Sequence, residues 1–188
     1  MKRTVLCGAI LAAFVPGVVL ADMNYTKFDV SLLDVELDGP FDVDGDGFAL
    51  AGSFELSDKL HLFGEWQDQS LDGGVDGRSV EFGAGMSHAF SDTLDFVGTL
   101  SYIDAEVKLG SFTADDDGLA LGGGVRTRVA DSFEVDAMLK YVDFDNSGSD
   151  TGVLVGGRYY FNDSMALGAS ADFNDSADTL RIGFRWEF

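Results

Sequence analysis

The feature that most constrains this chain is a repeated alternation of apolar and polar residues, because a period of two is typical of strands with two different faces. After residue 24 it recurs in runs of about ten, the length of a tilted strand that crosses a membrane. No stretch there carries an apolar stripe at helical spacing. The pattern predicts an all-β fold, and we place its ten strands at residues 25–37, 47–56, 60–70, 79–90, 94–107, 118–129, 133–143, 152–161, 165–173 and 179–188.

The connections alternate in length along the chain. Short turns at one end and longer loops at the other are typical of outer-membrane barrels, with the short turns in the periplasm. Both chain ends then lie on the turn side, which requires an even number of strands; eight is the alternative, and it would require discarding two clear runs. The short turns, each with a central aspartate, are 57–59, 91–93, 130–132 and 162–164, and the Asp/Gly-rich loops are 38–46, 71–78, 108–117, 144–151 and 174–178.

The two faces of the predicted strands differ sharply. One face is nearly all apolar, as in Phe48, Leu50, Phe54 and Leu56. Turning the opposite face to lipid would cost roughly 2 to 4 kcal/mol for each cation near the midplane, and a soluble barrel would leave a wide apolar belt in water. An open edge in lipid would leave backbone groups without partners, so we predict a closed antiparallel transmembrane β-barrel. The cations of its inner face are Lys27, Arg126, Arg128, Lys140, Arg158, Arg181 and Arg185.

The first residues are typical of a secretory signal peptide. Lys2 and Arg3 precede an apolar run that ends in a small-residue pattern at Ala21. We expect cleavage after Ala21, with residues 22–188 forming one barrel domain, and the alternative is that the leader stays as a membrane anchor. The only cysteine, Cys7, lies in the leader, so we expect no disulfide or thiol chemistry in the mature protein.

The chain is strongly acidic. Its formal net charge is −21, and loss of the two leader cations changes it to −23 (−21 minus 2). A nucleic-acid partner requires a basic face. We therefore expect no nucleic-acid binding.

The last eight residues resemble the C-terminal β-signal of Gram-negative outer-membrane barrels, with Gly183, Trp186 and the terminal aromatic Phe188 at the matching positions. The whole chain resembles the small OmpA-like and OmpX-like barrels, from which it departs in its ten apparent strands, its shorter loops and the lack of a periplasmic domain after Phe188. The resemblance implies an outer-membrane location, recognition by the barrel-assembly machinery, and lipid and lipopolysaccharide as surroundings. The adhesive and anchoring roles of those barrels are not carried over to this chain, and the oligomeric state stays open.

The inner-face charges predict a network that closes the lumen. Residues equidistant from a hairpin turn lie opposite one another, so the turn at residue 131 places Arg128 opposite Glu134 and Arg126 opposite Asp136. We expect both to form ion pairs. A count about the last loop sets Arg181 near Asp172. Across the barrel, we expect the acids Glu55, Glu65, Glu81 and Asp95 to face Arg158 and Arg185.

Catalytic residues are few. His61 is predicted to point inward and His88 outward, so no nucleophile, base and orienting group align. We expect no enzymatic activity.

The first loop carries Asp42, Asp44 and Asp46, which resemble the opening of an EF-hand loop, but the twelfth position is Ser53 instead of the bidentate glutamate. We therefore expect no metal site and no cofactor. Loosely bound Ca²⁺ or Mg²⁺ could still bridge acidic extracellular loops to lipopolysaccharide. A simply solvated acidic surface is the interpretation we favour. The other loop acids are Asp115, Asp116, Asp117 and Asp150.

Two functions fit these features. The first is a non-enzymatic integral barrel with a structural or surface-interaction role. The alternative is a narrow, porin-like channel for small solutes or ions. Inward Phe63, Met138, Leu154 and Tyr160 fill space along with the charged groups, which favours the first.

Overall fold

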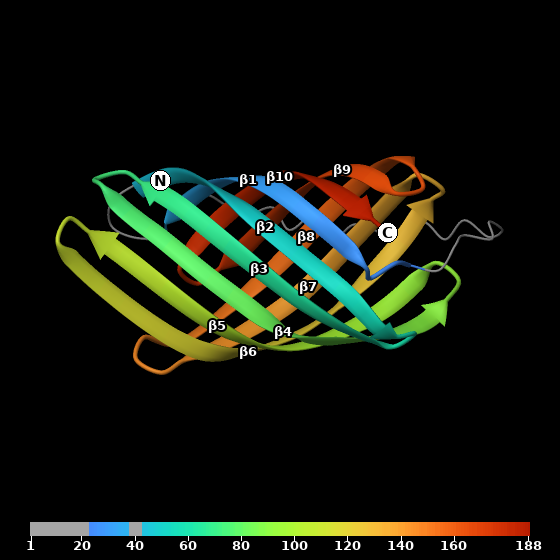
Figure 1. The fold of residues 1–188 in the computed structure, drawn as a ribbon, viewed down its shortest axis with the longest axis horizontal. Coiled ribbons are helices and arrows are strands. Elements are labelled where there is room, and N and C mark those ends of the chain that lie inside the picture. Colours follow the sequence, from blue (N-terminus) through green and yellow to red (C-terminus); the bar gives the residue numbers. More distant parts are fainter. Residues whose placement is uncertain (1–22, 38–42) are drawn as a thin grey trace, which may run out of the picture.

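The computed structural model describes residues 23–37 and 43–188, and they form a closed barrel of ten antiparallel strands (Figure 1). The predicted fold class and strand number are confirmed. The predicted leader with Cys7, and also Asp42, lie outside the described residues. The strands are β1 (Lys27–Leu37), β2 (Val43–Ser57), β3 (Leu60–Leu71), β4 (Val75–Ser91), β5 (Leu94–Leu109), β6 (Phe112–Ala130), β7 (Phe133–Phe144), β8 (Gly148–Asn162), β9 (Met165–Asn174) and β10 (Ala177–Glu187).

Each strand pairs with its neighbours in sequence, and β1 closes the barrel by pairing with β10 from Lys27↔Glu187 to Leu37↔Ala177. In Figure 1 the short turns lie at the right with the C-terminus, and the connections β3–β4, β5–β6, β7–β8 and β9–β10 lie at the left. No helix in the described part of the chain is long and apolar enough to cross a membrane.

The four short turns share one backbone feature. The register shifts by a residue immediately before each of them, for example between Glu55 and Ser57 and between Arg128 and Ala130. Such a bulge places two residues opposite one and increases the local twist. The repeated turn sequences therefore correspond to a repeated bulge-and-turn unit at the periplasmic end.

The loop side differs from the prediction, because the strands continue through much of the sequence that we expected to be loop. Strands β4, β5 and β6 have 17, 16 and 19 residues, and the β5–β6 hairpin extends beyond its neighbours (Figure 1). The acidic stretch 113–117 is therefore strand, and Gly110, with a φ of 60°, makes the tight turn. Strand propensity depends on packing and on cross-strand partners more than on residue type, so Asp-rich segments can still pair.

The outer face is apolar, as predicted, with exposed side chains such as Leu100, Leu121, Leu139, Leu167 and Ile182. Aromatic rings pair on this face near both ends of the strands. Rows of aromatics at both interfaces are typical of a membrane barrel. The pairs are Phe48–Trp66 (5.0 Å between ring centroids) and Phe82–Tyr102 (5.4 Å) on the loop side, and Phe90–Phe96 (5.5 Å) and Trp186–Phe188 (5.0 Å) on the turn side.

On the loop side, the turn between β7 and β8 is fastened to β6 by one carboxylate. The backbone N–H groups of Asn146 and Ser147 donate to Asp116 at 3.1 and 2.8 Å, and the Asn146 amide donates at 3.0 Å. The Ser147 hydroxyl also donates to this carboxylate, and these hydrogen bonds lower the pKa of Asp116 from its ordinary value of 3.8. Asp116 lies beyond the last aromatic row, in the extended part of β6.

We predict that this contact is stable at neutral pH and is lost in acid. Because the folded-state pKa of Asp116 is depressed, its contribution is complete above pH 3.8 and disappears as the pH falls through the lower folded value. The amide NMR signals of Asn146 and Ser147 should therefore shift together below pH 3.8, and Asp116→Asn should remove that transition. Asp115→Asn is the matched control, because the neighbouring side chain points to the opposite face. An unchanged transition in Asp116→Asn would contradict the assignment.

Candidate functional site

The lumen at the turn side of the barrel, the end that we expect to face the periplasm, is filled by a layer of charges centred on Glu134, which is completely buried (0% exposed). Its carboxylate lies 2.8 Å from Arg126, 3.3 Å from Arg158 and 3.4 Å from Arg185. A buried carboxylate is stable only when it is paired and hydrogen-bonded. We call this layer the floor network; it comprises Asp29, Arg126, Arg128, Glu134, Asp136, Arg158, Tyr160, Arg185 and Glu187.

The second buried acid of the floor network is Glu187, on the last strand. It accepts a hydrogen bond from the Tyr160 hydroxyl at 2.6 Å and lies 3.0 Å from Arg126. Arg128 is 3.8 Å from the same carboxylate, and its guanidinium lies 4.6 Å from the Tyr160 ring centroid. The network therefore joins β6, β7, β8 and β10 across the barrel.

The predicted cross-strand register is confirmed, but the ion pairs are staggered relative to it. Arg128 is opposite Glu134 and Arg126 opposite Asp136, yet Arg126 contacts Glu134, and Asp136 contacts Arg158. Long side chains reach diagonal neighbours on the same face of a sheet. Glu134 also lies directly opposite Arg158 on β8. Its carboxylate therefore contacts arginines of both neighbouring strands, Arg126 on β6 and Arg158 on β8.

Residues 23–26 enter the lumen before β1 begins. They occupy the side of the lumen that the floor network does not fill. Tyr25 is 6% exposed; its N–H donates to Glu55 at 2.8 Å and its hydroxyl donates to Asp95 at 2.9 Å. The Tyr25 ring stacks on the His61 imidazole, with 4.6 Å between the two ring centroids. The Arg126 guanidinium lies over the Tyr25 ring, 5.0 Å from its centroid. This segment and the floor network together close the periplasmic end.

The prediction that Glu55 and Asp95 face Arg158 and Arg185 across the barrel is wrong. Both acids instead accept hydrogen bonds from Tyr25, from its N–H to Glu55 and from its hydroxyl to Asp95. The alternation pattern could not show this, because the segment before the first strand follows no strand parity.

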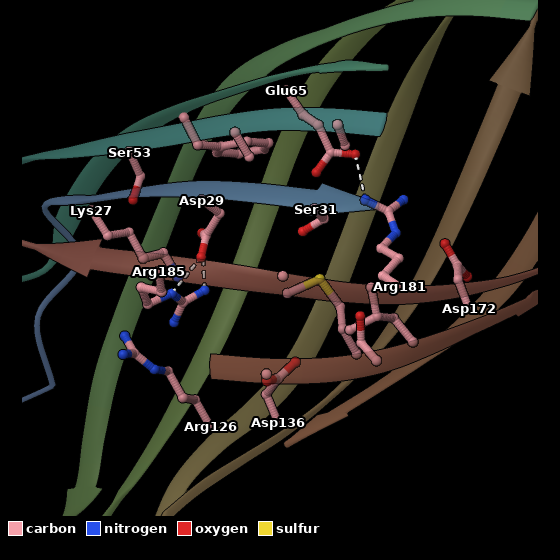
Figure 2. A pocket seen from close by; sticks show the side chains of 18 of the residues that line it. Lys27, Asp29, Ser31, Ser53, Glu65, Arg126, Asp136, Asp172, Arg181 and Arg185 are labelled. Carbon is pink, nitrogen blue, oxygen red and sulfur yellow. Dashed lines mark hydrogen bonds and ion pairs between the residues drawn. The ribbon is translucent and has the colours of Figure 1, made fainter. Parts of the chain in front are cut away.

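A cavity of about 360 Å³ adjoins the floor on the loop side. Figure 2 shows the pairs that line it: Arg185 contacts Asp29 at 2.7 Å, and Arg181 contacts Glu65 at 2.8 Å. Higher on the wall, Lys140 contacts Glu81 at 2.6 Å. Glu65 and Glu81 thus face cations, as expected, but the cations are Arg181 and Lys140. Lys27 and Asp172 also line the cavity, and among the described residues no ion pair includes either of them. Arg181 was expected near Asp172; the register places Asp172 opposite Thr179, diagonally across from Arg181.

The sequence reasoning missed three of the residues that build this site. Glu187 and Asp29 have the inward parity of their strands, and Asp29 is directly opposite Arg185, so the register of β1 on β10 would have identified both. Tyr25 carried no such signal.

No protein-family description matches the sequence, and no curated protein matches it. The translocator domain of the autotransporter NalP from Neisseria meningitidis is similar over 90% of this chain and 91% of its own, with 9% identity and a TM-score of 0.50. The NanC porin is similar over 86% of this chain and 100% of its own (13% identity, TM-score 0.48), and Neisserial surface protein A over 86% and 96% (13%, 0.46). The chain has the fold of an outer-membrane β-barrel.

In this barrel the residues of the resembled β-signal lie on the closing strand. Trp186 and Phe188 point outward and stack on each other, whereas Gly183 points inward against β1. A Cβ at Gly183 would lie 2.2 Å from the Ser31 hydroxyl oxygen and 2.7 Å from the Val30 carbonyl oxygen. The glycine is therefore required for the close approach of β1 and β10.

The candidate metal and catalytic residues are not brought together. Asp44 and Asp46 lie in β2 and not in a loop. The described residues contain no group of three or more His, Cys, Asp or Glu side chains placed to hold a metal ion. His61 faces the lumen against Tyr25, and His88 is exposed on the outer face, as predicted.

We predict that Glu134→Gln destabilises the barrel strongly, because it removes one charge from a buried cluster of three arginines. Breaking a buried pair costs about 3–5 kcal/mol, which denaturant unfolding of the refolded protein in lipid vesicles would measure. Glu106→Gln is the control: Glu106 contacts Lys108 at 2.6 Å, but the two side chains are 32% and 46% exposed, so the cost should be about 0–1 kcal/mol. Equal effects of the two substitutions would show that lumen water screens the floor network.

Proposed function

We propose that this protein is an integral outer-membrane barrel that is closed at its periplasmic end and serves a structural or surface-interaction role, without enzymatic activity. One observation carries the proposal: the lumen at that end is filled by buried, mutually paired side chains, with Glu134, Arg126 and Glu187 each less than 5% exposed. A steady aqueous path would require these charges to separate, and stranding one of them is costly.

The extended β4–β6 region supports a role at the cell surface. It lies on the loop side, at the end of the barrel opposite the C-terminus (Figure 1), and its outer face carries the acids Asp104, Glu106, Asp115 and Asp117 directly opposite one another in two cross-strand pairs. We place this acidic rim among lipopolysaccharide head groups and the apolar belt in lipid. Like charges directly opposite are unfavourable in a sheet, so Ca²⁺ or Mg²⁺ bridging remains the alternative to simple solvation.

A narrow channel is the second candidate, and the cavity of about 360 Å³ with its charged lining is the observation that favours it. In that case the floor would have to open. Arg158 and Arg185 would then line the constriction.

We predict that the mature protein, which we expect to begin at Asp22, fractionates with outer membranes, changes gel mobility on boiling, and gives no steady conductance in planar bilayers. A closed floor of buried pairs explains the missing current, and the compact barrel explains the mobility change. Recovery in the soluble periplasm would contradict the location. A stable, ion-selective current from the unmodified protein would favour the channel.

We also propose that the barrel-assembly machinery recognises the last strand, and we predict that deleting Phe188 impairs assembly while synthesis continues. Phe188 is 68% exposed on the outer face, so its loss should remove little from the folded barrel beyond its stacking on Trp186 and its two hydrogen bonds to residues 24 and 26. Phe173→Ala is a control, because Phe173 is also outward and exposed (49%) but lies outside the terminal motif. Cell fractionation with quantification of folded barrel is the measurement, and equal yields for the two variants would argue against a signal at Phe188.

A further inference from the structure

We infer that residues Met23–Thr26 form a removable plug, and that the periplasmic end of the lumen contains a binding groove for this short, tyrosine-bearing peptide segment. The groove is built by Ser53 and Glu55 of β2, His61 of β3 and Asp95 of β5, with Arg126 on its open side. The inference rests on the closed lumen of the proposed function and names the element that closes one half of it.

The contacts of Tyr25 match the chemistry of the groove. Its N–H and hydroxyl donate to the carboxylates of Glu55 and Asp95, and its carbonyl accepts from the Ser53 hydroxyl. Its ring lies flat on the imidazole of His61. Each polar group that Tyr25 brings into the lumen therefore has a partner, which a buried segment requires.

Without the plug, the carboxylates that line the groove would lose their hydrogen-bond donors. Among the described residues, no ion pair includes Glu55 or Asp95, so Tyr25 supplies donors that no cation replaces. Two cations lie near this side of the lumen: Arg126, which is opposite Asp95 in the register but pairs with Glu134 and Glu187, and Lys27, whose Nζ lies 6.0 Å from the Tyr25 ring centroid. This side of the barrel is thus complementary to a hydrogen-bond donor with an aromatic ring, and not to a free anion.

Arg126 joins the plug to the floor network. One nitrogen donates to the backbone carbonyl of Asn24 at 2.7 Å, and the other lies 2.8 Å from Glu134 and 3.0 Å from Glu187. The plug and the network therefore share one guanidinium. Each half of the floor depends on the other for its arrangement.

The plug can leave without breaking the barrel, because it precedes the strand ladder. Pairing of β1 with both neighbours begins at Lys27. Beyond the lumen contacts, the plug is held to the chain end by two hydrogen bonds, from the Asn24 amide to the Phe188 carbonyl at 2.7 Å and from the Phe188 N–H to the Thr26 carbonyl at 3.0 Å. A terminal segment outside the ladder can open locally at less cost than global unfolding.

Single-channel recording on refolded mature protein tests the plug. Wild type should be silent, whereas Tyr25→Ala and a variant lacking residues 22–25 should show steady openings, because half of the floor is then unfilled. Tyr25→Phe should open less than Tyr25→Ala, since it keeps the ring. The matched control is Tyr159→Ala, which removes a tyrosine that is 57% exposed on the outer face and should stay silent. Gel mobility before and after boiling confirms that each variant is folded.

A peptide of residues 22–26, added from the turn side, should block the variant that lacks residues 22–25, and the same peptide with alanine in place of tyrosine should not. Folded but silent Tyr25→Ala and deletion variants would overturn the plug and leave the closed barrel intact. Equal block by the two peptides would overturn the tyrosine-binding groove. Steady current from wild type would instead overturn the closed lumen itself.

Discussion

The pairing of β1 with β10 is the constraint on which the rest of this structure depends. In lipid an open sheet edge has no partner for its backbone groups, and here the two ends of the chain supply that partner along the full length of β1. The same pairing places Asp29 opposite Arg185 and brings Phe188 within hydrogen-bond distance of residues 24 and 26. Closure of the barrel and closure of its periplasmic end therefore use the same two strands. Both depend on Gly183, because any side chain at that position would collide with β1.

The distribution of charge follows from that closure. A strongly acidic chain places Lys27, Lys140 and five arginines on the lumen side, where buried carboxylates balance them. Lipid excludes these cations from the outer belt, and the lumen is the one place within the membrane where they can be paired. Asp104, Asp115 and Asp117 lie beyond the belt, on the extended β5 and β6 strands, where water can solvate them.

The sequence predicted what depends on strand parity and turn position. The ten strands, the apolar outer face, the register of Arg126 and Arg128 on β7 and the inward direction of His61 all follow from a period of two counted from short turns. Parity cannot say which of several inward neighbours a long arginine will contact, so the staggered pairs were not predicted. It also cannot describe residues outside a strand, and for that reason Tyr25 was missed. The Asp/Gly-rich stretches have the composition of loops, but antiparallel partners extend them as strands.

The position of Arg126 decides how the two candidate functions are related. Its guanidinium holds the Asn24 carbonyl, lies against the Tyr25 ring and contacts both buried glutamates. A change that withdraws the N-terminal segment would remove an acceptor and a ring from this arginine while leaving Glu134 and Glu187 in place. The guanidinium would then keep the two acids as its partners, and a path would open on the β2–β5 side. If the proposed plug withdraws, a closed barrel and a narrow channel would be two states of one lumen, which differ in the position of four residues.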